Sequence, residues 1–474
     1  MQLLWECLLA VKDGCVNVGI DSNSTSTMWL YVQSRDIDIV NLKIVSMHCK
    51  DFNLYEKLIE HKASVAVLGL GYVGFPLAIE FAKRFRTIGY DISSERIEEL
   101  RGTFEEAIDI TFTSNVADIS DASLYVISVP TPVDENKNPD LNQLLESSAV
   151  VGKCLSPGNF VVYESTVYPG CTEDKCIPVL EKESGLVCGD DFKVGYTPER
   201  INPNDAKHTL TNTVKIVSAC DDEALDCIAN IYNNIVDAGV ELVSCIKVAE
   251  ASKVLENTQR NVNIALMNEM AMLFSAMDID MTEVLKAAST KWNFVNYSPG
   301  LVGGHCIPVA PWFLVSAALE RNIDMRLVKM SSLVNDDMAS FIVQESLKRI
   351  DTIVKSAEQP IRALVMGYAY KENIDDIRNT LVEPIVKQLE EASMEVDIVD
   401  PFVNPAKAKA MYGRDLKLKP EAPYDLIMVT VAHDCYIDLD NDYFMSIALS
   451  NKSLLVDIRG IYKSKVKTLN YYSL

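Results

Sequence analysis

Hydrophobic and polar positions along the chain predict two regions in which strands and helices alternate. In the first region, a short apolar run at Ser64–Leu68 is followed by alternating helical and strand patterns up to about Val243. In the second, apolar runs lie at residues 362–366, 395–399, 426–430 and 454–457. Strands that alternate with helices form parallel sheets covered by helices. The sequence therefore predicts an α/β protein with two Rossmann-like doubly wound domains.

A long helix is predicted between the two alternating regions. Residues 247–277 have a helical pattern without Gly or Pro, a loop rich in Gly and Pro follows at 296–311, and another helix is predicted at about 325–350. We expect an NAD-binding Rossmann domain at 47–245, a central helical region at 246–352 and a second Rossmann-like domain at 353–474. Residues 1–46 lack a core pattern, and we expect this extension to be dispensable for folding and NAD binding.

Charge and cysteine usage narrow the class of protein. The 474 residues carry a formal net charge of −23, which argues against nucleic acid or an anionic membrane as partner, and no apolar stretch is long enough to cross a bilayer. The twelve cysteines are scattered without a CxxC pair or a zinc-like spacing, so we expect no metal and reduced thiols. Without a convincing signal peptide, the expected location is the cytoplasm.

A glycine-rich turn follows the first predicted strand. VAVLGLGYVG places Gly69, Gly71 and Gly74 between a strand and a helix, and Asp91 ends the next strand. Such glycines let the backbone approach a pyrophosphate at a helix N-terminus, and the acid binds ribose hydroxyls while repelling a 2′-phosphate. The pattern favours NAD over NADP, and a turn without a ligand is the weaker alternative. The intervening residues of the predicted cofactor loop are Tyr72 and Val73.

Three further strand ends carry polar side chains. Thr131 follows the strand at 124–129, Thr166 follows the strand at 159–163, and Glu199 and Arg200 lie in the later segment YTPERINP. Ligands in open α/β sheets bind beyond the carboxyl ends of strands. The threonines are candidates for active-site contacts or, equally, helix caps. Glu199 is a candidate general base, although an ion pair with Arg200 is the interpretation that the pair alone favours.

The long helix presents Lys253 and Asn257 on one face, with Arg260 beside them. A lysine and an asparagine that converge suit an oxyanion, because one supplies charge and the other a neutral donor. On periodicity alone, a solvated polar face is the preferred interpretation. The spacing of these residues does not decide between an oxyanion site and a solvated face.

The loop from Tyr297 to Cys306 contains three glycines whose amides are free to approach phosphate oxygens. We expect Cys306 to open a helix, where the helix field favours a thiolate nucleophile. A buried inert cysteine is the alternative. For the neighbouring His305 we favour a structural role.

In this order, these motifs resemble the UDP-glucose/GDP-mannose dehydrogenase family over about residues 51–457. The segments that carry the resemblance are GLGYVG, PTP, EST, YTPER, KVLENTQRNVNIALMNE, PGLVGGHC and YKENIDDIRNT. TPERINP, ENTQR and TKWNF most resemble the branch that acts on UDP-N-acetylhexosamines in surface polysaccharide synthesis, of the Vi-antigen and O-antigen type. The resemblance implies an NAD-dependent 6-dehydrogenase that oxidises the C6 alcohol of a UDP-sugar to a carboxylate in two steps. It also implies a homodimer.

The resemblance also assigns roles to residues of this chain. Cys306 matches the nucleophile that forms a thiohemiacetal and then a thioester, Lys253 and Asn257 stabilise the oxygen at C6, and Glu199 and Thr166 serve thioester hydrolysis. The implied cofactor contacts are Gly69, Gly71, Tyr72, Val73, Gly74, Asp91, Arg96, Thr131 and Arg378. The implied substrate contacts are Arg260, Tyr297, Gly300, Gly303 and Lys371.

One position departs from the family pattern. The family places an aspartate four residues after the nucleophile, whereas this chain has Ala310. UDP-glucose or GDP-mannose is the alternative substrate. A paralogue that binds nucleotide sugar and NAD without completing turnover is the alternative of a different class, and Ala310 favours it.

Overall fold

The computed structural model describes residues 53–101, 108–200, 207–353, 360–421 and 423–474. It also contains two short paired strands, β1 (Val16–Asn17) and β2 (Tyr31–Val32), within the predicted extension. The rest of residues 1–46 lies outside the described part, so the proposed dispensability of the extension stays a prediction. Residues 52–474 form one unit, which holds both predicted α/β regions.

The first sheet has eight strands in the order β10-β9-β8-β7-β6-β3-β4-β5. All neighbouring pairs are parallel except β8 with β9. Six of these strands reproduce the 3-2-1-4-5-6 order of the dinucleotide-binding fold, whose order reverses between β3 and β6. The strands are β3 (Val65–Leu68), β4 (Thr87–Tyr90), β5 (Ile110–Thr113), β6 (Leu124–Ile127), β7 (Phe160–Tyr163), β8 (Lys193–Tyr196), β9 (Lys215–Ala219) and β10 (Val240–Leu242).

The second sheet is parallel throughout, with the order β12-β11-β13-β14-β15. This is the other common doubly wound order, 2-1-3-4-5, so the predicted pair of Rossmann-like domains is confirmed. The edge strand β15 follows the last apolar run and was not predicted from the apolar pattern. The strands are β11 (Arg362–Met366), β12 (Glu395–Val399), β13 (Leu426–Val429), β14 (Leu454–Asp457) and β15 (Asn470–Ser473).

Helices pack on these sheets because each has an apolar face that water would otherwise contact. In α7 (Asp222–Asn233), the Asp221 side chain caps the first turn, and six buried residues face the sheet. With the first sheet lie α2 (Leu54–Ile59), α3 (Gly74–Ala82), α4 (Ser94–Arg101), the 3-10 turn η1 (Val116–Ile119), α5 (Asn142–Cys154), the π-helical turn η2 (Thr172–Cys176), α6 (Ile177–Ser184) and α7 (Asp222–Asn233). With the second lie α12 (Val382–Glu391), α13 (Pro405–Tyr412), α14 (Asp434–Ile437) and α15 (Asn441–Ile447).

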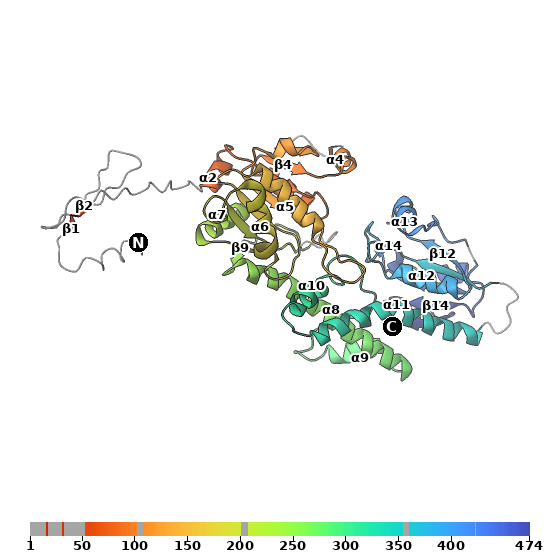
Figure 1. Cartoon of the computed structure of the whole chain (residues 1–474). Coiled ribbons are helices and arrows are strands. Elements are labelled where there is room, and N and C mark those ends of the chain that lie inside the picture. Colours follow the sequence, from red (N-terminus) through yellow and green to blue (C-terminus); the bar gives the residue numbers. More distant parts are fainter. Residues whose placement is uncertain are drawn as a thin grey trace. The chain divides into compact units, whose positions relative to one another are not determined.

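The predicted central helix is α8 (Ile246–Ala276), which Figure 1 shows beside α11 (Arg326–Ile353). A buried network of amides and hydroxyls joins the two helices: Asn261 donates to Ser331 and Ser332, and Asn268 donates to Asn335. The first turns of α8 share a core with the first sheet, and α11 packs on α12. The shorter helices α9 (Met281–Ala288) and α10 (Ala310–Leu319) complete this region. In the described residues, no helix is long and apolar enough to span a membrane.

Candidate active site

The glycine-rich turn between β3 and α3 is built by close backbone approach. Gly69 has φ +88°, which favours glycine, and a Cβ on Gly74 would lie 1.9 Å from the Gly69 carbonyl oxygen. At Gly71, by contrast, nothing lies within 4 Å of where a Cβ would stand. The outer glycines therefore shape the turn, and the middle one leaves its backbone open to a ligand. This arrangement fits a dinucleotide pyrophosphate.

Asp91 and Arg96 lie beside the same turn. The Asp91 carboxylate accepts the Leu70 amide at 2.8 Å and the Ser93 amide at 2.9 Å, which fixes it at the end of β4. The Arg96 Nε donates to the Leu70 carbonyl at 3.0 Å, and its guanidinium stands over the Phe75 ring. An acid at this strand end is where the ribose of a bound NAD would find an acceptor.

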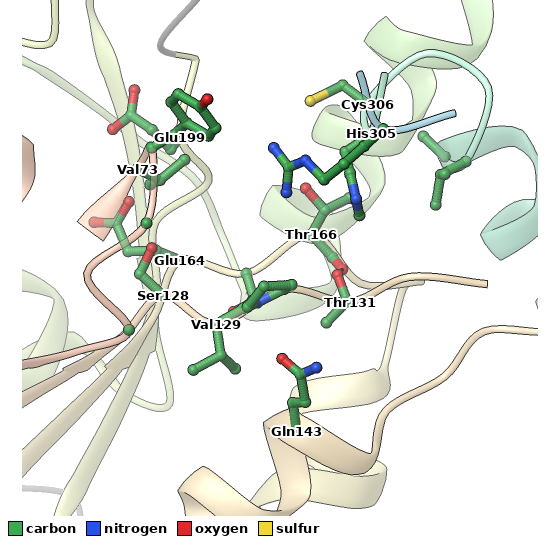
Figure 2. A pocket seen from close by; sticks show the side chains of 18 of the residues that line it. Val73, Ser128, Val129, Thr131, Gln143, Glu164, Thr166, Glu199, His305 and Cys306 are labelled. Atoms are coloured by element: carbon green, nitrogen blue, oxygen red, sulfur yellow. Dashed lines mark hydrogen bonds between the residues drawn. The ribbon is translucent and has the colours of Figure 1, made fainter. Parts of the chain in front are cut away.

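A cavity of about 610 Å³ opens beyond the carboxyl ends of β3, β6 and β7. Figure 2 shows Cys306 and His305 on one side of it, opposite Val73 and Ser128, with Thr166 between. The lining residues are Gly69, Gly71, Tyr72, Val73, Asp91, Arg96, Ser128, Val129, Pro130, Thr131, Gln143, Glu164, Ser165, Thr166, Glu199, Lys253, His305, Cys306, Val309, Ala310, Phe313, Tyr370, Arg378 and Lys407.

The second sheet contributes to this cavity through the segment after β11. Asp400, at the end of β12, accepts the amides of Tyr368 at 2.6 Å and Ala369 at 3.0 Å. Further along, Arg378 forms an ion pair with Asp376 at 2.7 Å and lies 5.3 Å from the Tyr72 ring centroid. The predicted cofactor residue Arg378 thus contacts the glycine-rich turn of the other sheet.

Lys253 and Asn257 are buried, at 7 % and 6 % exposure, so the solvated-face interpretation is wrong. The Lys253 ammonium lines the cavity and donates to the Glu199 carbonyl. Burial lowers the pKa of Lys253, and the nearby Cys306 partly opposes this. Within the described residues, the buried Asn257 amide nitrogen has no hydrogen-bond partner. A buried donor without an acceptor is costly, so a ligand oxygen at this place would satisfy it.

Cys306 is exposed to the cavity but does not open a helix, which corrects the sequence prediction. It lies in a turn, and α10 begins at Ala310, whose amide donates to the Cys306 carbonyl at 3.1 Å. A bend and a turn at residues 304–309 precede the helix. Burial and the charge of Arg378 lower the pKa of His305, which keeps this cavity-lining imidazole neutral near pH 7.

Glu199 pairs with a lysine that the sequence analysis did not single out. Lys215, at the start of β9, donates to Glu199 at 2.6 Å and to Glu164 at 2.8 Å, and all three side chains are buried. The predicted pair of Glu199 with Arg200 is therefore wrong, since Arg200 pairs with Glu256 on α8. Burial raises the pKa of Glu164, and Lys215 partly offsets this.

The two predicted threonines lie at neighbouring strand ends and contact each other. The buried Thr131 hydroxyl donates to the Thr166 carbonyl at 2.6 Å, and both residues line the cavity. Neither caps a helix in this arrangement.

Other predicted site residues do not line the cavity: Gly74, Asn257, Arg260, Tyr297, Gly300, Gly303 and Lys371. Arg260 is exposed on α8, and Tyr297 donates to Gln259 at 3.2 Å. The Gly300 amide donates to Asn268 at 2.8 Å, and a Cβ on Gly303 would lie 2.8 Å from Tyr370. Gly303 allows close packing of the loop against Tyr370, and Gly300 does not keep its amide free for a phosphate.

Sequence reasoning missed several lining residues, among them Glu164, Gln143, Phe313 and Tyr370. Glu164 had a signal, because it precedes Thr166 in the EST segment at a strand end. Lys215 gave only a weak signal in the sequence, because it is a charged residue at the start of an apolar strand. Among the described residues, no three His, Cys, Asp or Glu side chains form a group that could hold a metal ion.

Comparison with known proteins bears directly on this site. Residues 63–236 match the NAD binding domain, residues 247–337 the central domain and residues 364–464 the UDP binding domain of one family. The chain belongs to the UDP-glucose/GDP-mannose dehydrogenase family. It is therefore an NAD-dependent nucleotide-sugar dehydrogenase, and the predicted cofactor NAD is confirmed.

Several members of the dehydrogenase family are similar to this chain over most of their length. Protein CapL of Staphylococcus aureus is 44% identical, covering 85% of this chain and 96% of its own. The UDP-N-acetyl-D-glucosamine 6-dehydrogenase of Pseudomonas aeruginosa is 44% identical, covering 78% of this chain and 90% of its own. The enzyme of the same name from Salmonella typhi is 40% identical, covering 85% of this chain and 94% of its own. The solved UDP-D-ManNAc dehydrogenase of Pyrococcus horikoshii has a TM-score of 0.78 at 29% identity, covering 86% and 98%.

Proposed function

We propose that this dehydrogenase oxidises C6 of a UDP-N-acetylhexosamine, with UDP-N-acetylglucosamine first among the candidates, to the uronic acid used in surface polysaccharides. One observation carries this proposal: Cys306, Lys253 and Glu199 line one cavity with the glycine-rich turn. The relatives at 40% and 44% identity that are named for their substrate act on UDP-N-acetyl-D-glucosamine.

The residues at the cavity divide the work of the reaction. NAD held at the glycine-rich turn would supply the hydride acceptor for both oxidations at C6. The Cys306 thiolate attacks the C6 aldehyde, so this reactive product stays tethered as a thiohemiacetal and, after the second oxidation, as a thioester. Lys253, whose buried ammonium lines the cavity, stabilises the negative oxygen at C6 by its charge. Asn257 lies one turn further along α8, outside the cavity lining, and its unpartnered amide is the neutral donor that we assign to the same oxygen.

Hydrolysis of the thioester needs a base beside Cys306. Glu199 is a carboxylate that lines the described cavity. The Lys253 ammonium donates a hydrogen bond to the main-chain carbonyl of the same residue. Thr166 lies between the two sides of the cavity and helps to hold the attacking water. Arg96, Asp91 and Thr131 would hold the cofactor on the first sheet, and Arg378 would contact it from the second.

We further propose that two copies of the chain form a homodimer through α8. Val248, Leu255, Leu266 and Leu273 are 43% to 63% exposed and are spaced by seven, eleven and seven residues. At 3.6 residues per turn, these spacings place the four side chains within about 20° of one line along the helix. An uncovered apolar stripe of this kind is typical of an interface.

We place the enzyme in the cytoplasm. All nine cysteines that the structure describes are free of disulfides, which supports a reducing compartment. Its substrate in this proposal is a small nucleotide sugar.

An assay of NADH formation with a panel of nucleotide sugars tests the proposed activity. We expect UDP-N-acetylglucosamine to give two NADH per uronic acid and to be preferred over UDP-glucose and GDP-mannose. A preference for UDP-glucose would contradict the substrate, and one NADH per product would contradict the four-electron reaction.

A second candidate function rests on Ala310. This residue is buried at 1% exposure, lines the cavity and offers only a methyl group where the family pattern has a carboxylate. A protein that binds NAD and nucleotide sugar without turnover would show binding of both ligands and no NADH with any sugar of the panel.

A further inference from the structure

Glu199 belongs to a buried ion cluster that also contains Lys215 and a second carboxylate, Glu164. Lys215 donates to Glu199 at 2.6 Å and to Glu164 at 2.8 Å, so one ammonium is shared by two carboxylates. Glu164 is 3% exposed and also accepts hydrogen bonds from Thr197 at 2.7 Å and Tyr232 at 2.6 Å. Four elements of the first sheet and its helices thus converge on a cluster with one surplus negative charge.

The two carboxylates differ in what they can reach. Both residues line the cavity, but the side chain of Glu164 is 0% exposed, whereas that of Glu199 keeps 8%. The Glu164 carboxylate accepts hydrogen bonds from Lys215, Thr197 and Tyr232. Glu199 is therefore the member of the cluster that a water molecule in the cavity can approach.

We propose that Glu164 and Lys215 are positioning residues for Glu199, with Glu164 neutralising the Lys215 ammonium so that Glu199 stays basic enough to deprotonate the water that hydrolyses the thioester. This inference rests on the proposed function. In the hydrolysis step, a bond forms between the water oxygen and the C6 carbon while the C6–sulfur bond breaks. Glu199 takes one proton of the water, the other stays on the product acid, and Cys306 leaves as a thiolate that is reprotonated from Glu199 or solvent.

The sign of each effect follows from the charges. An ammonium at hydrogen-bond distance makes a carboxylate a weaker base, and a second carboxylate on that ammonium offsets the effect. Burial opposes a charge on Lys215, but the two carboxylates outweigh it and raise the pKa of Lys215, so the ammonium persists at neutral pH. Ala310 has no carboxylate to act as a base. In the described part of the cavity, Glu199 of this cluster is the carboxylate beside Lys253 that takes this role.

Other charged groups also face Glu199 and are held constant in the test. They are Arg200 and its partner Glu256, Lys253 on α8, and Tyr232 on α7. None of these is altered in the variants below.

The experiment compares pH profiles of the steady rate of NADH formation, from pH 5 to 9 with saturating UDP-N-acetylglucosamine, in the wild type and four variants. Glu164→Gln removes the offsetting charge, so the acid limb of the profile should move to lower pH by about one unit. Adding Lys215→Met to that variant should move the limb back upward by about one unit or more, because the ammonium is gone. The double variant removes one charge of each sign, which limits the cost of an unpaired buried charge.

Lys193→Met is the matched control. Lys193, on β8, is also a buried lysine shared by two acids, Asp221 at 2.8 Å and Glu223 at 3.1 Å, but it does not line the cavity. This variant should lose stability and leave the acid limb where it is.

The outcomes separate this inference from the function on which it rests. If Glu199→Gln hydrolyses the thioester as fast as the wild type, or if the wild type shows no turnover, the proposed base is wrong and so is its positioning. If Glu199→Gln is impaired but the limb of Glu164→Gln stays in place or moves upward, the inference alone is overturned. An equal shift in Lys193→Met would overturn it as well, since the effect would then be general.

Discussion

Cys306 and Ala310 are the two cavity residues on which the proposed reaction depends most directly. They are joined by a backbone hydrogen bond of 3.1 Å across the turn before α10, and both line the cavity. In the proposed reaction the Cys306 thiol traps the aldehyde, and Ala310 offers only a methyl group where an acid or base would assist. The first should decide whether turnover occurs, and the second how fast it is.

Substituting Cys306→Ser should abolish uronic acid formation while NAD and UDP-sugar binding persist, because a hydroxyl ionises far less than a thiol near neutral pH. Cys435→Ser, at an exposed cysteine of the second sheet's lobe, serves as control and should leave turnover intact. Product assays and ligand titrations measure the two properties. Unchanged uronic acid formation by Cys306→Ser would rule out the covalent route.

Restoring the acid with Ala310→Asp should raise the steady rate by roughly tenfold, since a positioned acid–base group typically contributes about a hundredfold or more. Residue 310 begins α10, where the helix field favours a negative charge. Rapid mixing of the wild type should show a burst of NADH, then a slow phase, with an adduct on Cys306 visible by mass spectrometry.

The control for this substitution is Ala310→Asn, because an asparagine has nearly the shape of an aspartate without a titratable group. It should keep the slow phase of the wild type. Equal steady rates in the wild type, Ala310→Asp and Ala310→Asn would show that the site does not lack a base.

At the scale of elements, α8 connects the site to the first sheet. Its first turns carry the buried Glu250, which accepts the amides of Gly170 and Thr172 at the turn before α6. One turn further along the helix comes Lys253, which reaches the cavity. The position of Lys253 at the cavity therefore depends on the buried Glu250 side chain of the same helix.

Burial raises the pKa of Glu250 to about 7 from 4.5, although the two amides oppose the shift. The folded protein thus retains a proton that the unfolded chain releases, so the stability that Glu250 contributes is complete below pH 4.5 and is lost as pH rises through 7. The free energy of unfolding of the wild type, measured by urea titration, should fall relative to that of Glu250→Gln between pH 5 and 7, by at most about 1.4 kcal/mol per pH unit.

Glu269→Gln, at an exposed position of the same helix, is the control for the pH series and should follow the wild type. Parallel midpoints of wild type and Glu250→Gln at every pH would contradict the assigned proton.

At the scale of the molecule, two sheets with different strand orders contribute to one cavity, and the α8 stripe is left uncovered. Leu266→Glu, in that stripe, should weaken dimerisation at least tenfold, because a buried unpaired charge costs well over 1.4 kcal/mol. Light scattering over a dilution series measures the change. Leu418→Glu, at a leucine that is 97% exposed on the second lobe, should not alter assembly. A wild type that is monomeric at micromolar concentration would contradict the dimer.

Local pattern determined much of this protein. Apolar periodicity predicted both sheets and α8, since a buried strand or helix face must be apolar wherever it packs. Gly69, Gly74 and Asp91 were identified because the steric demands of a dinucleotide turn act within a short segment. The candidate residues Cys306, Lys253 and Glu199 were named, but spacing could not decide between their functional and ordinary roles. The proposed domain boundaries stay predictions.

Tertiary structure decided the rest, because burial and partners depend on residues far apart in the chain. Lys253 and Asn257 were indistinguishable from a solvated face until α8 was packed, and Glu199 received Lys215, sixteen residues away, rather than its neighbour Arg200. Gly300 and Gly303 were assigned to phosphate, but the Gly300 amide donates to Asn268 and Gly303 packs against Tyr370. The sequence by itself determined the fold and the chemical groups, whereas only folding chose which charges share a buried space, since the energy of a charge is set by its surroundings.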